Sequence, residues 1–509
     1  MGSPGRPSGP VTRQLIGLVL GPALFAGILL FAPFDIPAAA NAALGSTLWI
    51  ATWWVTEAIP IPATSLLPIV LFPLTGVGNV ATATTPYADP VVFLLLGGFL
   101  LAVGIERWDL HRRIALAVVR LVGVRPDRLL LGFMVATAFL SMWISNSATA
   151  MLMVPIATAV IVSVGTIDEP DRPGAEENGD DELVVGVRVE PEDRPAADFG
   201  LALMLGIAYG ASIGGMATLI GSPPNAVFAG VAASQLDVHI SFLDWLVFAG
   251  PLSVAFLVVT WAFLVAVLRP ELPLDGNVEA VVRSQRAALG PFSRGERRVL
   301  GVFVLVAAGW LLRPFVLQPL FPAVTDTVVA IVGAVLLFVV PADYGNREFL
   351  LDWGDATRVP WGVLLLLGAG FSLANGFQES GLDEVIARAL AGIGVVPLVV
   401  LVGAVATVVV FLTEVTSNTA TATVFMPILI SLGTTLGVPP LTLMATAALA
   451  ASLAFMLPVA TPPNAVVFGS GYVTIPQMSR VGLWLNLLGI VAIVALTYAW
   501  LPVALAVAG

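Results

Sequence analysis

The chain carries two copies of a short polar phrase, each inside strongly apolar sequence. The first is Ser-Asn-Ser at 145–147 and the second is Ser-Asn-Thr at 417–419, and a Pro-Pro-Asn phrase follows each copy, at 223–225 and 462–464. Small hydroxyls, amides and paired prolines suit a membrane helix that is broken so that its exposed backbone faces a polar solute instead of lipid. The duplication indicates a transporter.

These residue types favour an anion bound beside a cation. Where a helix stops, its unpaired amides and its positive N-terminal end face the same spot, which suits a carboxylate. Carbonyl oxygens at the opposite, unwound ends are uncharged hard ligands that suit Na⁺. None of the four phrases contains arginine, so a bound Na⁺ is the expected compensating charge. The alternative is that these side chains only join helices, at about 1 kcal/mol each, but four phrases in matched pairs favour a site.

The composition requires lipid as the outer solvent. Of the 509 residues, 58% are hydrophobic and 11% are charged, which leaves too few polar groups to cover a soluble globule of this size. Apolar stretches long enough to span ~30 Å of hydrocarbon predict eleven transmembrane helices, near 14–34, 42–57, 62–77, 90–106, 200–220, 240–268, 298–315, 325–341, 359–376, 440–460 and 482–506. Two further stretches, about 129–164 and 392–433, hold the Ser-Asn phrases in their middle and predict re-entrant hairpins.

Arginines predict the orientation, because positively charged loops stay on the cytoplasmic side. Six precede the first hairpin and six crowd the central loop: Arg107, Arg112, Arg113, Arg120, Arg125 and Arg128, then Arg269, Arg283, Arg286, Arg294, Arg297 and Arg298. Counting spans from these loops gives a cytoplasmic N-terminus and an external C-terminus. The two hairpins then enter from opposite sides, which predicts an inverted repeat with its substrate near the bilayer midplane.

The predicted organisation follows this repeat. Residues 1–164 form the first half and end in the inner hairpin, and an acidic cytoplasmic loop at 165–198 carries twelve acids against three arginines. The remainder of the first repeat covers 199–268, a cytoplasmic linker covers 269–298, and the second repeat with the outer hairpin covers 299–509. A charged run of this kind is typical of a solvated loop.

One acidic residue at membrane depth needs an explanation. Glu414 lies three residues before Ser417, where a charge is costly unless it is paired or hydrated. Orientation of the hairpin tip, proton sensing and a purely structural hydrogen-bonding role all remain open at this point.

The sequence resembles the divalent anion:sodium symporters, which move dicarboxylates, citrate or sulfate. The likeness covers nearly the whole chain, through both hairpin tips, both Pro-Pro-Asn breaks, and the motifs Trp53-Trp54-Val55-Thr56-Glu57-Ala58, Gly97-Gly98-Phe99 and Pro360-Trp361-Gly362. The resemblance implies an all-α polytopic membrane protein with eleven spans and two opposed hairpins. It also implies a scaffold domain that forms a homodimer and a transport domain that moves as an elevator.

The resemblance further implies at least two Na⁺ sites and a substrate site. The first Na⁺ site would use Ser141, Ser145, Asn146 and Gly221, and the second would use Thr413, Thr416, Asn418 and Ala460. Substrate carboxylates would meet Ser145, Asn146, Ser147, Ser222, Pro223, Ser417, Asn418, Thr419, Thr461 and Pro462. Ser147 and Thr416 depart from the residues common in the family, so the resemblance fixes the class of anion only.

The expected function is sodium-coupled symport of a C4-type dicarboxylate such as succinate across the plasma membrane, with no nucleic-acid partner. Import of a dianion against an inside-negative potential of 100 mV costs about 4.6 kcal/mol, which favours ion coupling. Alternatives are a Na⁺-independent dicarboxylate exchanger, which would need a cationic substitute near one ion site, a sulfate or citrate transporter, and a channel. An intramembrane enzyme is disfavoured, because the sequence contains no His-Glu-x-x-His or Gly-x-Gly-Asp motif.

Overall fold

The computed structural model describes residues 12–31, 36–123, 125–164, 194–270, 278–343, 345, 348–390 and 396–499. Within these ranges the protein is almost entirely helical, and its only strands are the short antiparallel pair β1 (Pro341–Asp343) and β2 (Glu348–Phe349). Most of the acidic loop predicted at 165–198 lies outside the described residues.

The first part of the chain forms α1 to α12. Their bounds are α1 Thr12–Phe31, α2 Ala38–Thr56, α3 Ile61–Thr64, α4 Leu67–Thr75, α5 Val80–Thr84, η1 Thr85–Ala88, α6 Pro90–Arg107, α7 Leu110–Val122, α8 Pro126–Ser141, α9 Asn146–Val164, α10 Arg194–Gly215, α11 Pro223–Leu236 and α12 Phe242–Leu268.

The second part contains α13 to α24. Their bounds are α13 Val278–Ala288, α14 Arg294–Leu312, η3 Arg313–Leu317, α15 Gln318–Leu320, α16 Asp326–Val339, α17 Trp353–Ala356, α18 Trp361–Ser380, α19 Leu382–Leu390, α20 Leu398–Thr413, α21 Asn418–Leu436, α22 Pro440–Ala450, α23 Pro462–Gly469 and α24 Ile475–Ala499.

Eight helices in the described residues are long and apolar enough to cross a membrane, and five shorter apolar helices accompany them. The protein is therefore a multi-pass membrane protein. Both predicted hairpins are helix pairs, α8–α9 and α20–α21, and each turns at its Ser-Asn phrase.

Three predicted spans differ from the structure. The stretch predicted at 62–77 is divided between α3 and α4, where Pro68 lacks the backbone N–H that a continuous helix would use. The helices predicted over 200–220 and 440–460 end at Gly215 and Ala450, so each leaves a non-helical segment before its Pro-Pro-Asn phrase.

The two hairpins pack against matching partners. In the first set, α10 contacts both α8 and α9; in the second set, α22 contacts both α20 and α21. The sets also cross over, because α9 contacts α23 and α11 contacts α21. Each hairpin therefore lies against the short helix that follows the other set's break, and this exchange brings the four polar phrases together.

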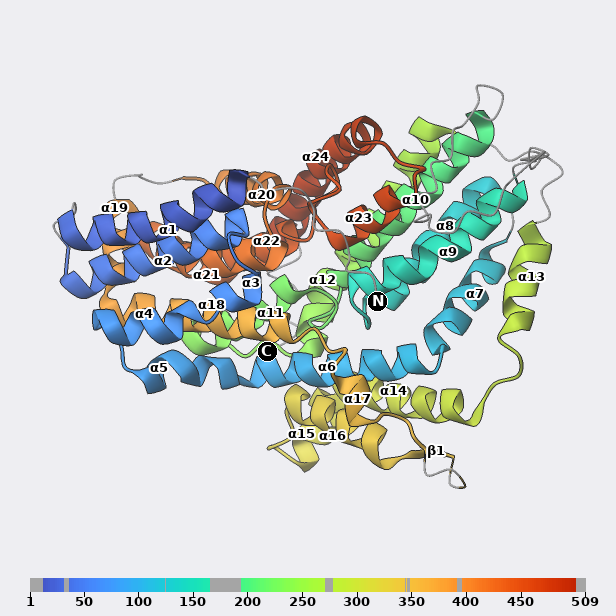
Figure 1. Cartoon of the computed structure of the whole chain (residues 1–509), viewed down its shortest axis with the longest axis horizontal. Helices are drawn as coiled ribbons and strands as arrows, with labels where there is room; N and C mark the ends of the chain where they lie inside the picture. The colour runs from blue at the N-terminus through green and yellow to red at the C-terminus, as the bar shows by residue number, and fades with distance from the viewer. Residues whose placement is uncertain are drawn as a thin grey trace, which may run out of the picture.

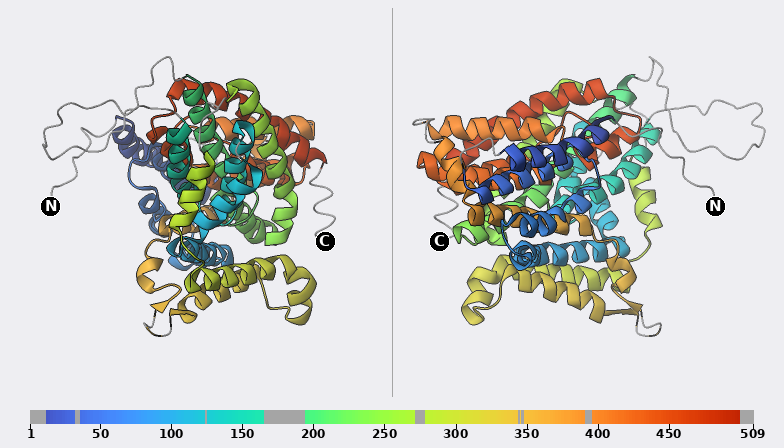
Figure 2. Two further views of the ribbon diagram at one scale, coloured as in Figure 1. Left: turned by 90° about the vertical axis from the view of Figure 1, so that its right-hand side faces the viewer. Right: turned by 60° about the vertical axis from the view of Figure 1, so that its left-hand side comes forward.

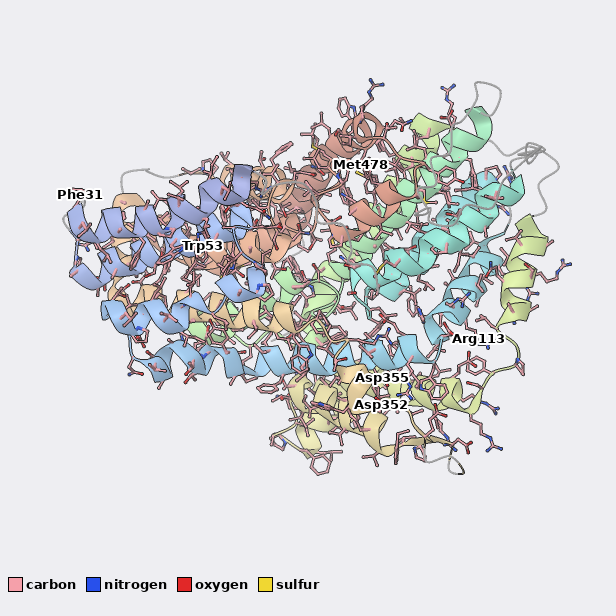
Figure 3. The ribbon with its side chains drawn as sticks, in the orientation of Figure 1. Phe31, Trp53, Arg113, Asp352, Asp355 and Met478 are labelled. Atoms are coloured by element: carbon pink, nitrogen blue, oxygen red, sulfur yellow. The ribbon has the colours of Figure 1, made fainter. Side chains whose placement is uncertain are left out.

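The other helices surround this centre. In Figure 1, α1 and α2 lie side by side at one end of the molecule, and α8, α9 and α10 lie at the other. Helices α14 and α16 form a separate layer against α6, which the two rotated views also show (Figure 2). Ion pairs hold the C-terminal end of α6, where Arg107 pairs with Asp352 and Asp355. The two aspartates are labelled in Figure 3.

Candidate functional site

Each hairpin tip is a short turn that ends in a serine. In the first tip, the Ser145 hydroxyl accepts a hydrogen bond from the Ala148 amide at 3.3 Å. In the second, Ser417 is the N-cap of α21, and its hydroxyl lies 3.5 Å from the Ala420 amide. These contacts satisfy one of the free amides at the start of each helix. The tips thus present helix N-termini with Asn146 and Asn418 in their first turn.

A buried asparagine shapes each break. The Asn225 amide donates to the carbonyls of Gly215 at 3.2 Å and Thr218 at 2.7 Å. Asn464 donates to the carbonyls of Ala454 and Leu457, both at 3.0 Å, which lie the same ten and seven positions upstream. Carbonyls that lose their helical partners need another donor when they are buried, and the asparagine of each Pro-Pro-Asn phrase supplies it.

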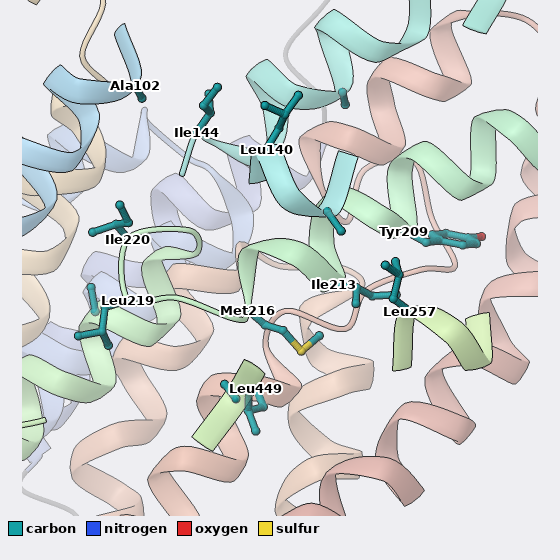
Figure 4. Close-up of a cluster of buried hydrophobic side chains, with 14 of the residues drawn as sticks. Ala102, Leu140, Ile144, Tyr209, Ile213, Met216, Leu219, Ile220, Leu257 and Leu449 are labelled. Atoms are coloured by element: carbon teal, nitrogen blue, oxygen red, sulfur yellow. The ribbon is translucent and has the colours of Figure 1, made fainter. Parts of the chain in front are cut away.

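Apolar packing holds the first break in place. The segment that follows α10 carries Met216, Leu219 and Ile220, all of them buried. Figure 4 shows them in a cluster with Ile213 of α10, near Ile144 of the first tip. The non-helical backbone is consequently fixed by side chains on both of its flanks.

The two tips and the two breaks line one cavity of about 730 Å³. All ten residues predicted to bind substrate line it: Ser145, Asn146, Ser147, Ser222, Pro223, Ser417, Asn418, Thr419, Thr461 and Pro462. Six of the eight predicted ion ligands line it as well: Ser145, Asn146, Gly221, Thr416, Asn418 and Ala460. The other two, Ser141 and Thr413, are buried directly behind the tip asparagines.

The first candidate ion pocket surrounds the Asn146 side chain. One end of its amide lies 2.5 Å from the Ser141 hydroxyl, 3.2 Å from the Gly221 carbonyl and 3.3 Å from the Ala211 carbonyl. An amide nitrogen in that place would donate hydrogen bonds, whereas an amide oxygen there would complete a group of four neutral oxygens. Such a group is the kind of ligand set that a hard monovalent cation prefers.

Glycine lets the backbone reach this pocket. A Cβ atom on Gly221 would lie 2.6 Å from the Gly215 carbonyl oxygen and 2.9 Å from that of Ser141. A Cβ atom on Gly215 would lie 2.3 Å from the Asn146 side chain. All three distances are shorter than non-bonded contacts allow, so the carbonyls converge only because these two positions carry no side chain.

The second candidate ion pocket repeats the central contact. The Thr413 hydroxyl donates to the Asn418 side-chain oxygen at 2.5 Å and lies 3.3 Å from the Ala451 carbonyl. The hydroxyl of Thr416, which also lines the cavity, bonds the Leu412 carbonyl at 2.8 Å and the Thr421 hydroxyl at 2.6 Å. Neutral oxygens again predominate.

Glu414 ties the second tip to the second break. Its carboxylate is 3% exposed and accepts four hydrogen bonds. The donors are the amides of Phe455 at 2.8 Å, Met456 at 2.9 Å and Leu457 at 3.1 Å, and the Asn486 side chain at 2.7 Å. Of the roles left open by the sequence, this geometry supports orientation of the site. A carboxylate with four donors is held firmly in place.

Two contacts at this site were not predicted from the sequence. The hydroxyls of Ser222 and Ser452 lie 3.0 Å apart and join the two breaks. Arg13, at the start of α1, lines the cavity and donates to the Val415 carbonyl beside the second tip. An arginine before the first apolar stretch was visible in the sequence, but nothing local indicated a partner 402 positions away.

The chemistry of the donors fits Na⁺. In the described part of the chain, no group of three His, Cys, Asp or Glu side chains is arranged to hold a metal ion. The two candidate ion pockets offer hydroxyl, amide and carbonyl groups instead, and such hard neutral oxygens suit an alkali metal better than a transition metal.

Two solved structures share this architecture at low sequence identity. The YdaH transporter of Alcanivorax borkumensis matches with a TM-score of 0.52 at 14% identity, over 90% of this chain and 98% of that one. MtrF of Neisseria gonorrhoeae, from a class of antimetabolite efflux pumps, matches with a TM-score of 0.55 at 12% identity, over 92% and 95%. At this identity the likeness extends to the fold alone.

Sequence relatives are much closer. The sodium-dependent dicarboxylate transporter SdcS of Staphylococcus aureus strain MRSA252 is 41% identical over 502 residues, which cover 97% of this chain and 93% of that protein. SdcS of strain USA300 is 41% identical over 500 residues, or 97% and 92%. Residues 12–506 match the family described as the sodium:sulfate symporter transmembrane region. The chain therefore belongs to this family of transporters, the divalent anion:sodium symporters that its motifs resemble, and is not an enzyme.

Proposed function

We propose that the protein is a sodium-coupled symporter of C4-type dicarboxylates such as succinate. One observation carries the proposal: the four polar phrases line a single cavity, and the two Ser-Asn phrases stand at the N-termini of α9 and α21. The likeness to transporters named for sodium-dependent dicarboxylate transport supports the same substrate class.

In this proposal, each tip holds one end of the substrate. The first carboxylate meets Ser145, Asn146 and Ser147, and the second meets Ser417, Asn418 and Thr419. Hydroxyls and free amides at the start of α9 and α21 supply hydrogen bonds, and each helix dipole favours the negative charge. Two Na⁺ ions, one in each pocket behind a tip asparagine, would cancel the charge of a dianion.

The proposed coupling depends on the tip asparagines. Asn146 and Asn418 each line the substrate cavity and also face the oxygens of a candidate ion pocket. Occupation of a pocket would fix the asparagine in the orientation that the substrate needs. Ion binding would then raise substrate affinity, and linkage requires substrate to raise ion affinity by the same factor.

We further propose an inverted repeat that moves as an elevator within a homodimer in the plasma membrane, with the N-terminus in the cytoplasm. The paired asparagine contacts of the two breaks and the crossed packing of α9 with α23 and α11 with α21 support the repeat. The arginine-rich segments beside α7 and α13 support the orientation.

Arg13 gives a specific reason to test a Na⁺-independent exchanger as the second candidate. It is a cationic side chain beside the second tip, which is what such an exchanger would require in place of one ion. Symport remains the preferred function, because both pockets have neutral oxygens arranged around an asparagine.

Uptake into proteoliposomes separates these functions. Labelled succinate, citrate, α-ketoglutarate and sulfate would each be tested with Na⁺, Li⁺ or choline outside. We expect saturable uptake of succinate that requires Na⁺, with weaker uptake of the other anions. Equal counterflow of succinate in Na⁺ and in choline would refute symport in favour of exchange, and preferential uptake of sulfate would refute the substrate assignment.

A further inference from the structure

Arg13 places a positive charge beside the second hairpin tip. It lies in the first turn of α1, and its Nη2 donates to the carbonyl of Val415 at 3.1 Å and to that of Val55 near the end of α2. Val415 stands two positions before Ser417 in the turn that forms the tip. The guanidinium therefore touches the backbone from which the tip is built.

The rest of the guanidinium is available to a ligand. Within the described part of the chain, its Nε and Nη1 make no hydrogen bond, and Arg13 forms no salt bridge with a carboxylate. Its side chain is exposed and lines the same cavity as both tips. Among the described residues that line this cavity, Arg13 is the only basic one and Glu57 is the only acidic one.

A fixed cation in this place would act on a dianion in two ways. Its field attracts a doubly charged solute into the cavity, an effect that mobile salt screens over about 10 Å at 0.1 M. Its planar fork also suits a carboxylate, which can accept two parallel hydrogen bonds from one guanidinium. The tips themselves supply only neutral donors, so Arg13 provides what they lack.

We propose that Arg13 is a specificity-determining residue that recruits the dianionic substrate and binds one of its carboxylates at the entrance to the site, before the hairpin tips receive it. This inference rests on the proposed function, because it assigns the substrate of the same cavity. It adds a side-chain contact from α1, outside the four polar phrases, and a reason for preferring two negative charges over one.

A purely structural role has a different signature. Arg13 also lies at the C-terminal ends of α2 and α20, where a cation satisfies free carbonyls and interacts well with the helix dipole. Glutamine in its place keeps an N–H donor for a carbonyl and loses the charge. Lysine keeps the charge but lacks the planar guanidinium that can donate two parallel hydrogen bonds to one carboxylate. The two substitutions therefore separate recruitment from support.

The test compares Arg13→Gln and Arg13→Lys with the wild-type chain in proteoliposomes. Initial rates of labelled succinate uptake at saturating Na⁺ would give KM and kcat, and Arg120→Gln, on the exposed face of α7 away from the cavity, controls for loss of one positive charge. We expect Arg13→Gln to raise KM about fivefold to tenfold with kcat within about twofold of wild type. Arg13→Lys should stay within about threefold of the wild-type KM, and Arg120→Gln should match wild type.

Salt provides the second measurement. Addition of 0.5 M choline chloride should shrink the difference in KM between wild type and Arg13→Gln to about twofold, because screening removes the long-range attraction. An unchanged KM in Arg13→Gln would overturn the inference. The inference would also be overturned if Arg13→Gln and Arg13→Lys lost kcat equally and salt did not alter the loss, because that result would indicate a purely structural role for Arg13.

Failure of the proposed function has a separate outcome. If wild-type protein moves sulfate instead of succinate, or moves succinate without Na⁺, the proposed symport is wrong. The same comparison of variants then proceeds with the anion and the ionic conditions that the wild type uses, because the inference concerns the second negative charge of the solute.

Discussion

The two hairpin-and-break units hold similar sites by different chemistry. In the first, the Thr218 hydroxyl donates to the Met142 carbonyl at 2.6 Å and accepts from the Gly221 amide at 3.0 Å. In the second, the Glu414 carboxylate joins the tip to the break by accepting hydrogen bonds from four donors. A neutral hydroxyl therefore supports one site, and a buried charge supports the other.

The length of each break explains the difference. The first non-helical segment covers 216–222, and the second covers 451–461. A longer segment leaves more backbone amides without helical partners, and buried amides must be paired. One carboxylate has enough lone pairs to satisfy three successive amides, which a single hydroxyl cannot do. The two units therefore share the shape of the site but not the residue that supports it.

Removal of the tip asparagines should have the largest effect in both units. We expect Asn146→Ala and Asn418→Ala each to reduce succinate uptake at least about 100-fold, because each asparagine serves an ion pocket and the substrate cavity together. Size-exclusion chromatography and thermal unfolding should show folded protein in both cases. Retention of uptake by one variant would break the equivalence of the two tips.

Substitution of Glu414 and of Thr218 should affect Na⁺ binding to different extents in the two hairpin-and-break units. Glu414→Gln should raise the half-saturating Na⁺ concentration about tenfold and lower the Tm. Glutamine keeps only one side-chain oxygen and turns an NH₂ group toward a backbone amide that now donates to the carboxylate, and hydrogen bonds to a charged group are worth about 1.5–3 kcal/mol. Thr218→Ala loses two neutral hydrogen bonds, each about 1 kcal/mol, and should change the same quantity about threefold. Equal effects in a Na⁺ titration would contradict the distinction between charged and neutral support.

Gly221 and Ala460 occupy corresponding positions in the two breaks, and substitution of Ala460 should have the smallest effect on Na⁺ affinity. Gly221→Ala pushes a methyl group against two backbone carbonyls that cannot rotate away, so it should lower Na⁺ affinity about tenfold or more. Ala460→Gly removes the corresponding methyl group from the second break and should change Na⁺ affinity by less than about threefold. Calorimetric titration with Na⁺ would measure both, and tolerance of Gly221→Ala would show that the first carbonyl group does not need its close approach.

Much of the candidate site could be predicted from local signals. The polar phrases, their duplication and the hairpins around them follow from residue types that break apolar helices. The predicted ends of the helices were less accurate than the predicted breaks. For example, the sequence predicts a helix to about residue 460, whereas α22 ends at Ala450. The reason is that Asn464 and Glu414 bond the backbone after Ala450, and neither contact is local.

By itself, the sequence determined that the chain is a helical membrane protein, that it carries two matched pairs of helix breaks, and which residue types those breaks present. These properties depend on composition and on neighbours a few positions apart. Only the tertiary structure decided that the four phrases line one cavity, that Glu414 meets amides more than 40 positions away, and that Arg13 lies beside Val415. Such contacts depend on how whole helices pack, and packing combines surfaces from the entire chain.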